Sequence, residues 1–172
     1  MLTEVVFDVE TKTFFDEAGT LDPSKLGVSI VSLYARKLDK NLKEIEGKML
    51  SFWEREFEKP FKFPHFDILA KIKEATGRRT SLHSLAKATL GTQKIDSGGN
   101  AIRYWNKGDV KSLNLLKRYC EKDVEITRDI YDYGLKNNIL KFTDYWNNPR
   151  EVGVDFSRHP NNETFVPQQS LF

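Results

Sequence analysis

The stretch VVFDVETK, residues 5–12, is an apolar run that ends at two carboxylates, Asp8 and Glu10. Its β-branched and aromatic residues favour a strand, and side chains two positions apart in a strand point the same way, roughly 6.6 Å apart. Two buried like charges repel each other and lose hydration, so a fold tolerates such a pair where a cation compensates. The stretch therefore predicts a first strand that presents a metal-binding pair. The alternative is a strand that simply ends in solvent.

The size and composition of the chain predict an ordinary globular domain. It has 172 residues, of which 39% are hydrophobic and 30% charged, which suffices for one domain with a proper core. It contains neither an apolar stretch of membrane-spanning length nor the pattern of a signal peptide. A single cysteine, Cys120, excludes an internal disulfide. We therefore expect a cytoplasmic protein without membrane association, in which Cys120 is an ordinary thiol.

Basic residues are concentrated in one segment, although the net charge of the whole chain is only +2. Lys71–Lys94 contains six basic residues and one acid, which gives this segment a net charge of +5. Such a segment attracts a phosphate backbone. A solvated helix face has the same composition, so both interpretations stay open.

The order of the apolar patterns predicts strands first and helices afterwards. Three antiparallel strands, joined in part by a turn at Asp39-Lys40-Asn41, are expected at residues 3–11, 26–39 and 42–50. Helical periodicity follows at residues 51–60, 65–77, 81–91 and 109–138. Ser81 and Asp109 are the expected N-caps of the last two helices. The helix at residues 65–77 is expected to end at Gly77, and Gly91 is expected just past the end of the helix that Ser81 caps.

The remaining segments are predicted to be irregular. DSGGN, residues 96–100, has the composition of a loop, and the polar chain from Asn147 onward has no periodicity. The predicted class is therefore α/β (α+β), with strands followed by helices. One domain is expected over residues 1–145 and an extended tail over residues 146–172.

A second motif, YCEKD at residues 119–123, places Tyr119 and Asp123 four positions apart. Residues with this spacing lie on one face of a helix. A carboxylate there can join a metal site, and a tyrosine one turn earlier can reach the water that attacks phosphorus. The alternative is a tyrosine that packs beneath a surface aspartate.

Together the two motifs resemble a known family. F-D-x-E-T at residues 7–11 and Y-x-x-x-D at residues 119–123 are similar to the first and third motifs of the DEDD 3′–5′ exonucleases. The tyrosine marks the DEDDy branch, because the DEDDh branch has a histidine where this chain has Arg118. Further segments, such as KLGVSIVSLYA and SLHSLAKATLG, resemble a bacterial YprB-like group of predicted proofreading-type exonucleases over residues 1–145.

The resemblance implies a ribonuclease H-like fold, in which a mixed sheet with an antiparallel meander is flanked by helices. It implies that Asp8, Glu10 and Asp123 bind two Mg²⁺ or Mn²⁺ ions and that Tyr119 orients the nucleophilic water. The expected activity is 3′–5′ hydrolysis of single-stranded or frayed DNA ends in replication or repair, with RNA as an alternative substrate.

One motif of the family is missing between these two. The family has an asparagine a few residues before a Phe-Asp pair, whose aspartate holds the second metal. In the region that follows the predicted strands, from Ser51 onward, the only Phe-Asp is Phe66-Asp67. It lies within a segment similar to the one on the C-terminal side of that motif, and Lys62 and Phe63 stand where the asparagine is expected. Three explanations are open: the segment between Glu58 and Phe61 is lost, Asp67 has taken over the role, or a stretch of the natural protein is absent from this sequence. Loss would leave a catalytically weak or inactive binding module, recruited to DNA or to a sliding clamp.

The final residues QQSLF, 168–172, resemble the short peptide by which bacterial repair proteins dock on the sliding clamp. Such a peptide buries two apolar anchors while a glutamine makes hydrogen bonds, here Leu171, Phe172 and Gln168. The alternative is a terminus that happens to end in apolar residues. Docking on a clamp would favour DNA as the substrate.

Overall fold

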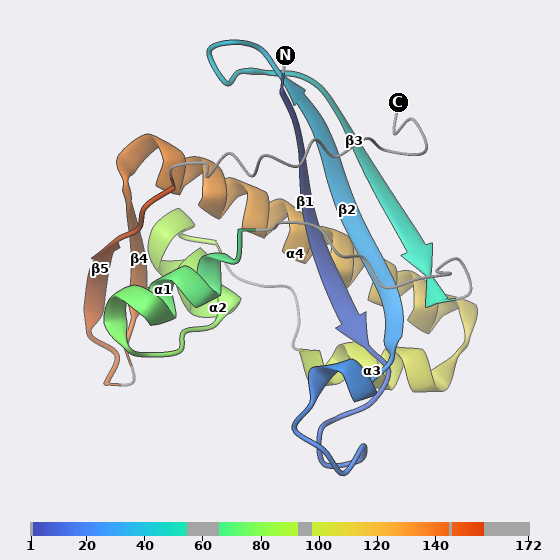
Figure 1. The fold of residues 1–172 in the computed structure, drawn as a ribbon. Coiled ribbons are helices and arrows are strands. Elements are labelled where there is room, and N and C mark those ends of the chain that lie inside the picture. Colours follow the sequence, from blue (N-terminus) through green and yellow to red (C-terminus); the bar gives the residue numbers. More distant parts are fainter. Residues whose placement is uncertain (1, 55–65, 93–97, 145, 157–172) are drawn as a thin grey trace. The chain divides into compact units, whose positions relative to one another are not determined.

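The computed structural model (Figure 1) describes four stretches of the chain, residues 2–54, 66–92, 98–144 and 146–156. Contacts divide the chain into two compact units. The first comprises residues 1–59 and 95–125, and the second comprises residues 60–94 and 126–172. One long helix, α4, contributes its first half to the first unit and its second half to the second. The predicted domain and tail boundaries stay a prediction.

The first unit opens with a three-stranded antiparallel sheet in the order β1-β2-β3. Its strands are β1 (Leu2–Thr11), β2 (Val28–Leu38) and β3 (Glu44–Trp53). At the turn between β2 and β3, the Asp39 carboxylate accepts hydrogen bonds from the N–H groups of Asn41 and Lys43, at 2.8 and 2.9 Å. The predicted meander is confirmed.

Strand β1 alternates between half-buried and exposed side chains. The even-numbered residues, which include Asp8 and Glu10, are half-buried, because alternate side chains of a strand point to opposite faces. Three of the odd-numbered residues form what we call the β1 apolar row, Val5, Phe7 and Val9, which are 42%, 36% and 40% exposed. Within the described sheet β1 is an edge strand.

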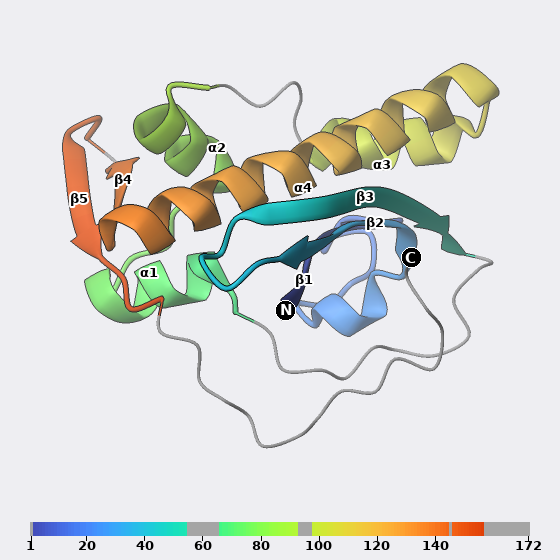
Figure 2. The same ribbon diagram turned by 90° about the horizontal axis from the view of Figure 1, so that it is seen from above.

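Two helical segments complete the first unit, α3 (Gly98–Lys107) and the beginning of α4 (Val110–Asn137). Figure 2 shows both lying along the sheet. The two helices contact the sheet through a small core of side chains from β2, α3 and α4: Ile30, Ala101, Leu116, Tyr119 and Cys120. Asp109 caps α4 as predicted, because its Oδ1 accepts a hydrogen bond from the N–H of Ser112 at 2.9 Å.

The second unit packs helices on a two-stranded hairpin. Its elements are α1 (Ile68–Thr76), α2 (Leu82–Leu85), a π-helical turn (Ala86–Leu90), the second half of α4, and the paired strands β4 (Ile139–Thr143) and β5 (Pro149–Gly153). Ser81 caps α2, and α1 ends at Gly77 with a φ of 70°, so both predicted boundaries are confirmed. The core is formed mainly by aliphatic side chains, with Phe142 and Phe156.

Three sequence-based predictions of secondary structure are wrong in part. Ser51–Trp53 are strand, because they pair with Ile30–Ser32 and this pairing outweighs the helical pattern; residues 55–60 lie outside the described residues. The predicted loop 96–100 already belongs to α3 from Gly98. The predicted irregular extension contains β5, which the Asp144 carboxylate helps to fold back by accepting hydrogen bonds across the turn.

The structure contains no helix, among the residues it describes, that is both long and apolar enough to cross a bilayer. The longest described helix, α4, carries charged side chains throughout its length.

Gly134→Ala is expected to lower the free energy of unfolding by about 1–3 kcal/mol. A Cβ at Gly134 would lie 2.1 Å from Cζ of Phe156. This ring cannot easily move, because it stacks on Phe66 at 5.3 Å and contacts Tyr131 edge-on at 5.7 Å. The clash outweighs the gain of about 1 kcal/mol that alanine offers in a helix. Urea denaturation measures the effect, and Gly153→Ala, whose Cβ meets nothing nearer than 4.0 Å, is the control. Equal stability of the two variants would contradict the packing argument.

Candidate metal centre

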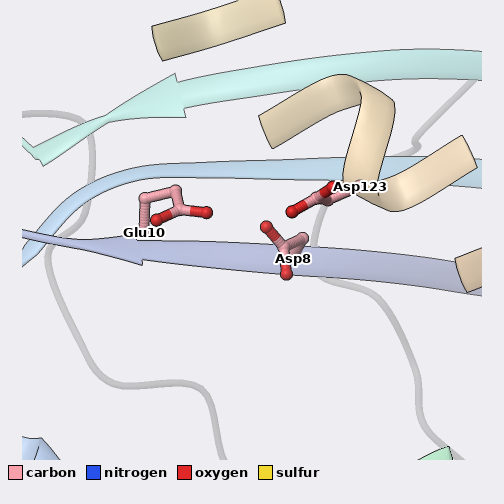
Figure 3. A group of neighbouring side chains, drawn as sticks. All are labelled: Asp8, Glu10 and Asp123. Atoms are coloured by element: carbon pink, nitrogen blue, oxygen red, sulfur yellow. The ribbon is translucent and has the colours of Figure 1, made fainter. Parts of the chain in front are cut away.

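Asp8, Glu10 and Asp123 come together in the first unit, as Figure 3 shows. One carboxylate oxygen from each lies within 4.8 Å of the others. Asp8 and Glu10 project from β1, and Asp123 projects toward them from α4. Asp8 and Glu10 are half-buried, and Asp123 is 3% exposed. Residues separated by more than a hundred positions thus form one cluster of negative charge.

The local structure of β1 explains why it presents two of these carboxylates. Asp8 pairs with Ser32 and Glu10 with Ile30 in the antiparallel register, and the register shifts directly after Glu10. The hydroxyl of Ser29 donates to the carbonyl oxygens of Glu10 and Thr11, at 3.0 and 3.4 Å. These hydrogen bonds hold the end of the strand in place, so both carboxylates keep a common orientation.

Asp123 belongs to the apolar stripe of α4. The stripe consists of positions with helical spacing that are at most 4% exposed: Leu116, Tyr119, Cys120 and Val124. Asp123 falls within the same spacing, where an aliphatic residue is the usual choice. A carboxylate on the buried stripe is a departure from the helical pattern, and this is the signal by which the sequence marks it.

Tyr119 lies one turn before Asp123 and shares a side-chain hydrogen bond with it. Burial raises the pKa of the Tyr119 phenol far above its usual value, and the negative charges of Asp123, Glu10 and Asp8 raise it further. The phenol therefore keeps its proton at neutral pH and acts as a hydrogen-bond donor.

Cys120 touches the cluster, which the sequence did not indicate. Its Sγ lies 3.6 Å from the backbone oxygen of Asp8 and 3.6 Å from Oδ2 of the same residue. Burial raises the pKa of this thiol, and the charge of Asp8 raises it further. Cys120 is therefore a neutral, weak donor that supports the Asp8 carboxylate. Its position three residues before Asp123, on the same helix face, is the only trace of this contact in the sequence.

A chain of hydroxyl groups ties α4 to the sheet beside the cluster. The hydroxyls of Ser32 and Ser51 lie 2.9 Å apart, and that of Ser51 donates to Oε1 of Glu121 at 2.8 Å. Glu121 stands between Tyr119 and Asp123 on the helix. These hydrogen bonds restrict movement of α4 along the sheet, and they too were missed by sequence reasoning.

The cluster fits a hard divalent cation. Mg²⁺ and related ions prefer carboxylate oxygens, and oxygens on opposite sides of Mg²⁺ lie roughly 4.2 Å apart, given bonds of about 2.1 Å. The observed 4.8 Å limit requires only small side-chain adjustments. Zinc sites are usually built from histidine and thiolate, and this cluster contains neither. It is the only group of this kind among the described residues.

Of the remaining predicted positions, Asp67 belongs to the second unit and the others lie outside the described residues. Oδ1 of Asp67, in the second unit, accepts a hydrogen bond from the N–H of Ala70 at 3.0 Å and so caps α1. The positions expected for the missing motif, Lys62 and Phe63, lie outside the described residues. The same holds for the proposed clamp-binding residues, Gln168, Leu171 and Phe172.

Comparison with known proteins places the chain at superfamily level. A family model described as RNase_H superfamily matches residues 40–134, more than half of the chain. The match includes Tyr119 and Asp123 but begins after β1. No curated protein and no solved structure gives a match. The superfamily agrees with the predicted ribonuclease H-like α/β class, and the chain belongs to the RNase_H superfamily.

Proposed function

We propose that this chain is a divalent-metal-dependent 3′–5′ exonuclease of the DEDDy type, acting on single-stranded or frayed DNA. Membership of the RNase_H superfamily indicates nuclease-type activity, and nucleases of this fold usually use divalent metals. One observation carries the finer proposal. Asp8, Glu10 and Asp123 converge within 4.8 Å, and Tyr119 is hydrogen-bonded to Asp123.

In this proposal the three carboxylates hold Mg²⁺ or Mn²⁺, which when bound supplies an activated water and neutralises the charge that develops on the phosphate. The Tyr119 phenol, which keeps its proton, orients the attacking water through a hydrogen bond. Cys120 and the Ser51–Glu121 bond keep Asp8 and α4 in position. Preference for a 3′ end follows from the resemblance of the two motifs to the DEDDy exonucleases.

DNA is the preferred substrate because of the clamp-binding peptide that we propose at residues 168–172. Docking on a sliding clamp would hold the chain near DNA ends and raise their effective concentration. The preference is independent of the metal centre, so an RNA substrate would change the biological setting and leave the mechanism intact.

The proposal predicts stepwise shortening of a 5′-labelled single-stranded oligonucleotide from its 3′ end in the presence of Mn²⁺. The products are separated on a sequencing gel, with DNA and RNA of the same sequence compared. A chain-terminating block at the 3′ end should stop the reaction, and a block at the 5′ end should not. Chelation of the metal should abolish it.

The rival function is a binding module that has lost turnover with the missing motif. Isothermal titration with Mn²⁺ separates the two functions by the number of ions bound, since a complete centre takes up two ions and a centre that lacks the fourth carboxylate takes up one or none. Oligonucleotide binding without hydrolysis at saturating Mn²⁺ would favour the module. Hydrolysis that persists without metal would contradict both functions.

A further inference from the structure

The second unit carries a surface depression of about 500 Å³ that the metal centre does not involve. One wall is the connection between α1 and α2 with the start of α2, including Arg78, Arg79 and Thr80. The other wall is the end of β4 and the following turn, including Thr143 and Trp146. Helix α2 and strand β4 are held together there, because Ser84 Oγ donates to the carbonyl oxygen of Thr143 and accepts from its N–H.

Two cations and an aromatic ring meet at this depression. The guanidinium carbon of Arg78 lies 5.1 Å from the ring centroid of Trp146, a cation–π contact. Trp146 is 63% exposed, which is unusual for so large an apolar ring. Neither Arg78 nor Arg79 forms an ion pair with a carboxylate within the part of the chain that the structure describes. Their charge is therefore available to an anion.

A hydroxyl group adds a further donor. Thr80 Oγ1 is the one buried side-chain oxygen or nitrogen without a hydrogen-bond partner among the described residues. Buried polar groups are generally hydrogen-bonded, and exceptions often lie where a ligand or water completes the set. Thr80 lines the depression, next to the two arginines.

The acidic residue of the depression, Asp144, does not oppose an anion. Its Oδ1 accepts hydrogen bonds from the N–H groups of Trp146 and Asn148, both at 2.9 Å, and its Oδ2 accepts one from Arg150 Nε at 2.9 Å. Its side chain is only 2% exposed. Burial acts to raise the pKa of Asp144, but these hydrogen bonds outweigh it and hold the pKa below its usual value. The charge is compensated within the turn.

We propose that this depression binds a nucleotide unit of a single-stranded nucleic acid, with its phosphates on Arg78 and Arg79 and its base on Trp146. Guanidinium groups match phosphate oxygens in geometry, and stacking on an aromatic ring accepts any base. The surrounding segment Lys71–Lys94 has a net charge of +5, which would attract the rest of the strand. An acidic peptide would engage the arginines without using the indole. The inference rests on the proposed function insofar as that function makes nucleic acid the substrate.

The test is binding of a 5′-fluorescein single-stranded DNA oligonucleotide, measured by fluorescence anisotropy without metal and in an Asp8→Asn background that excludes hydrolysis. Trp146→Ala is expected to weaken binding by about fivefold to a hundredfold, and Trp146→Phe is expected to restore most of it. Changing Arg78 and Arg79 together to serine should weaken binding at least about tenfold. The double variant should also make the slope of log K against log salt shallower, by about one to two.

A matched control removes two exposed charges from the turn between β2 and β3, by changing Lys40 and Lys43 together to serine. It should bind within about twofold of the parent. Circular dichroism confirms that each variant is folded. Three outcomes overturn the proposal: unchanged binding by the arginine and tryptophan variants, loss with the arginine pair but not with Trp146→Ala, or competition by a polyglutamate peptide as effective as that by the oligonucleotide.

The two proposals fail separately. If the wild-type chain shows metal-dependent hydrolysis and the depression variants bind the oligonucleotide normally, only the proposal that the depression is a binding site is wrong. Absence of hydrolysis in the wild-type chain, combined with binding that depends on Trp146, removes only the nuclease function and leaves a nucleic-acid binding site.

Discussion

Asp123→Asn is expected to lower the rate of metal-dependent oligonucleotide hydrolysis by about 10³-fold or more. The amide keeps the size of the side chain and an oxygen that can accept the Tyr119 hydrogen bond, but it removes a charge from the cluster. A bound divalent ion stabilises transition-state charge by several kcal/mol, and each 1.4 kcal/mol is a factor of ten in rate. The measurement is initial rate on a 5′-labelled oligonucleotide at saturating Mn²⁺.

Measurements of thermal stability with and without Mn²⁺ distinguish loss of metal binding from loss of the fold. Without metal, Asp123→Asn should be at least as stable as the wild-type chain, because one of three clustered negative charges is gone. Mn²⁺ should raise the melting temperature of the wild-type chain but not that of the variant. Asp8→Asn should behave likewise. Asp129→Asn, on the exposed face of the same helix and paired with Arg128, is the control and should keep full activity. Near wild-type hydrolysis by Asp123→Asn would exclude the proposed metal centre.

Tyr119→Phe is expected to lower kcat by about 10²-fold or more, because misplacing a reacting group by about 1 Å can cost about 10²-fold in rate. KM should change only a few-fold, because the phenol hydroxyl acts on the water and on Asp123 rather than on substrate binding. The ring stays in place, packed in the core with Leu116 and Cys120, so the fold should be unchanged. Single-turnover kinetics at saturating substrate measure the effect.

The control for this prediction is Tyr133→Phe, which removes a hydroxyl from the other half of α4. It should keep the wild-type kcat. A loss of less than tenfold in Tyr119→Phe would assign Tyr119 to packing, with its hydroxyl serving only to satisfy Asp123. An increase in KM with kcat unchanged would instead indicate that the hydroxyl contacts the substrate.

The elements that could be predicted from the sequence are those whose signal is local. The β1–β2–β3 meander follows from alternating or continuous apolar runs and from a turn in which the Asp39 carboxylate accepts hydrogen bonds from the N–H groups of Asn41 and Lys43. The ends of α1 and α2 follow from a capping Ser81 and from Gly77, which adopts the left-handed conformation that glycine allows. Asp8, Glu10, Tyr119 and Asp123 could be singled out because strand and helix periods fix which side chains share a face.

The elements that could not be predicted depend on distant contacts. Ser51–Trp53 become strand because β2 offers them backbone partners, and β5 forms because Asp144 closes a turn with three separate donors. The contact of Cys120 with Asp8 joins residues far apart in sequence, and no period within either segment encodes it. The distance within the carboxylate cluster has the same origin, since it is set by how α4 packs on the sheet.

The β1 apolar row lies on a strand that is at the edge of the described sheet, so the charge of the site bears on whether two such strands can pair. Edge strands are usually protected by lysine, proline or inward-pointing charges, and β1, LTEVVFDVET, contains neither lysine nor proline. Its charges are Glu4, which is paired with Arg36 at 2.8 Å, and the site residues Asp8 and Glu10. Bound divalent ions would neutralise these last two and leave a strand with high β-propensity and little net charge, which is the composition of aggregation-prone segments. The ions that the proposed reaction requires therefore also remove the electrostatic repulsion that keeps such edges apart.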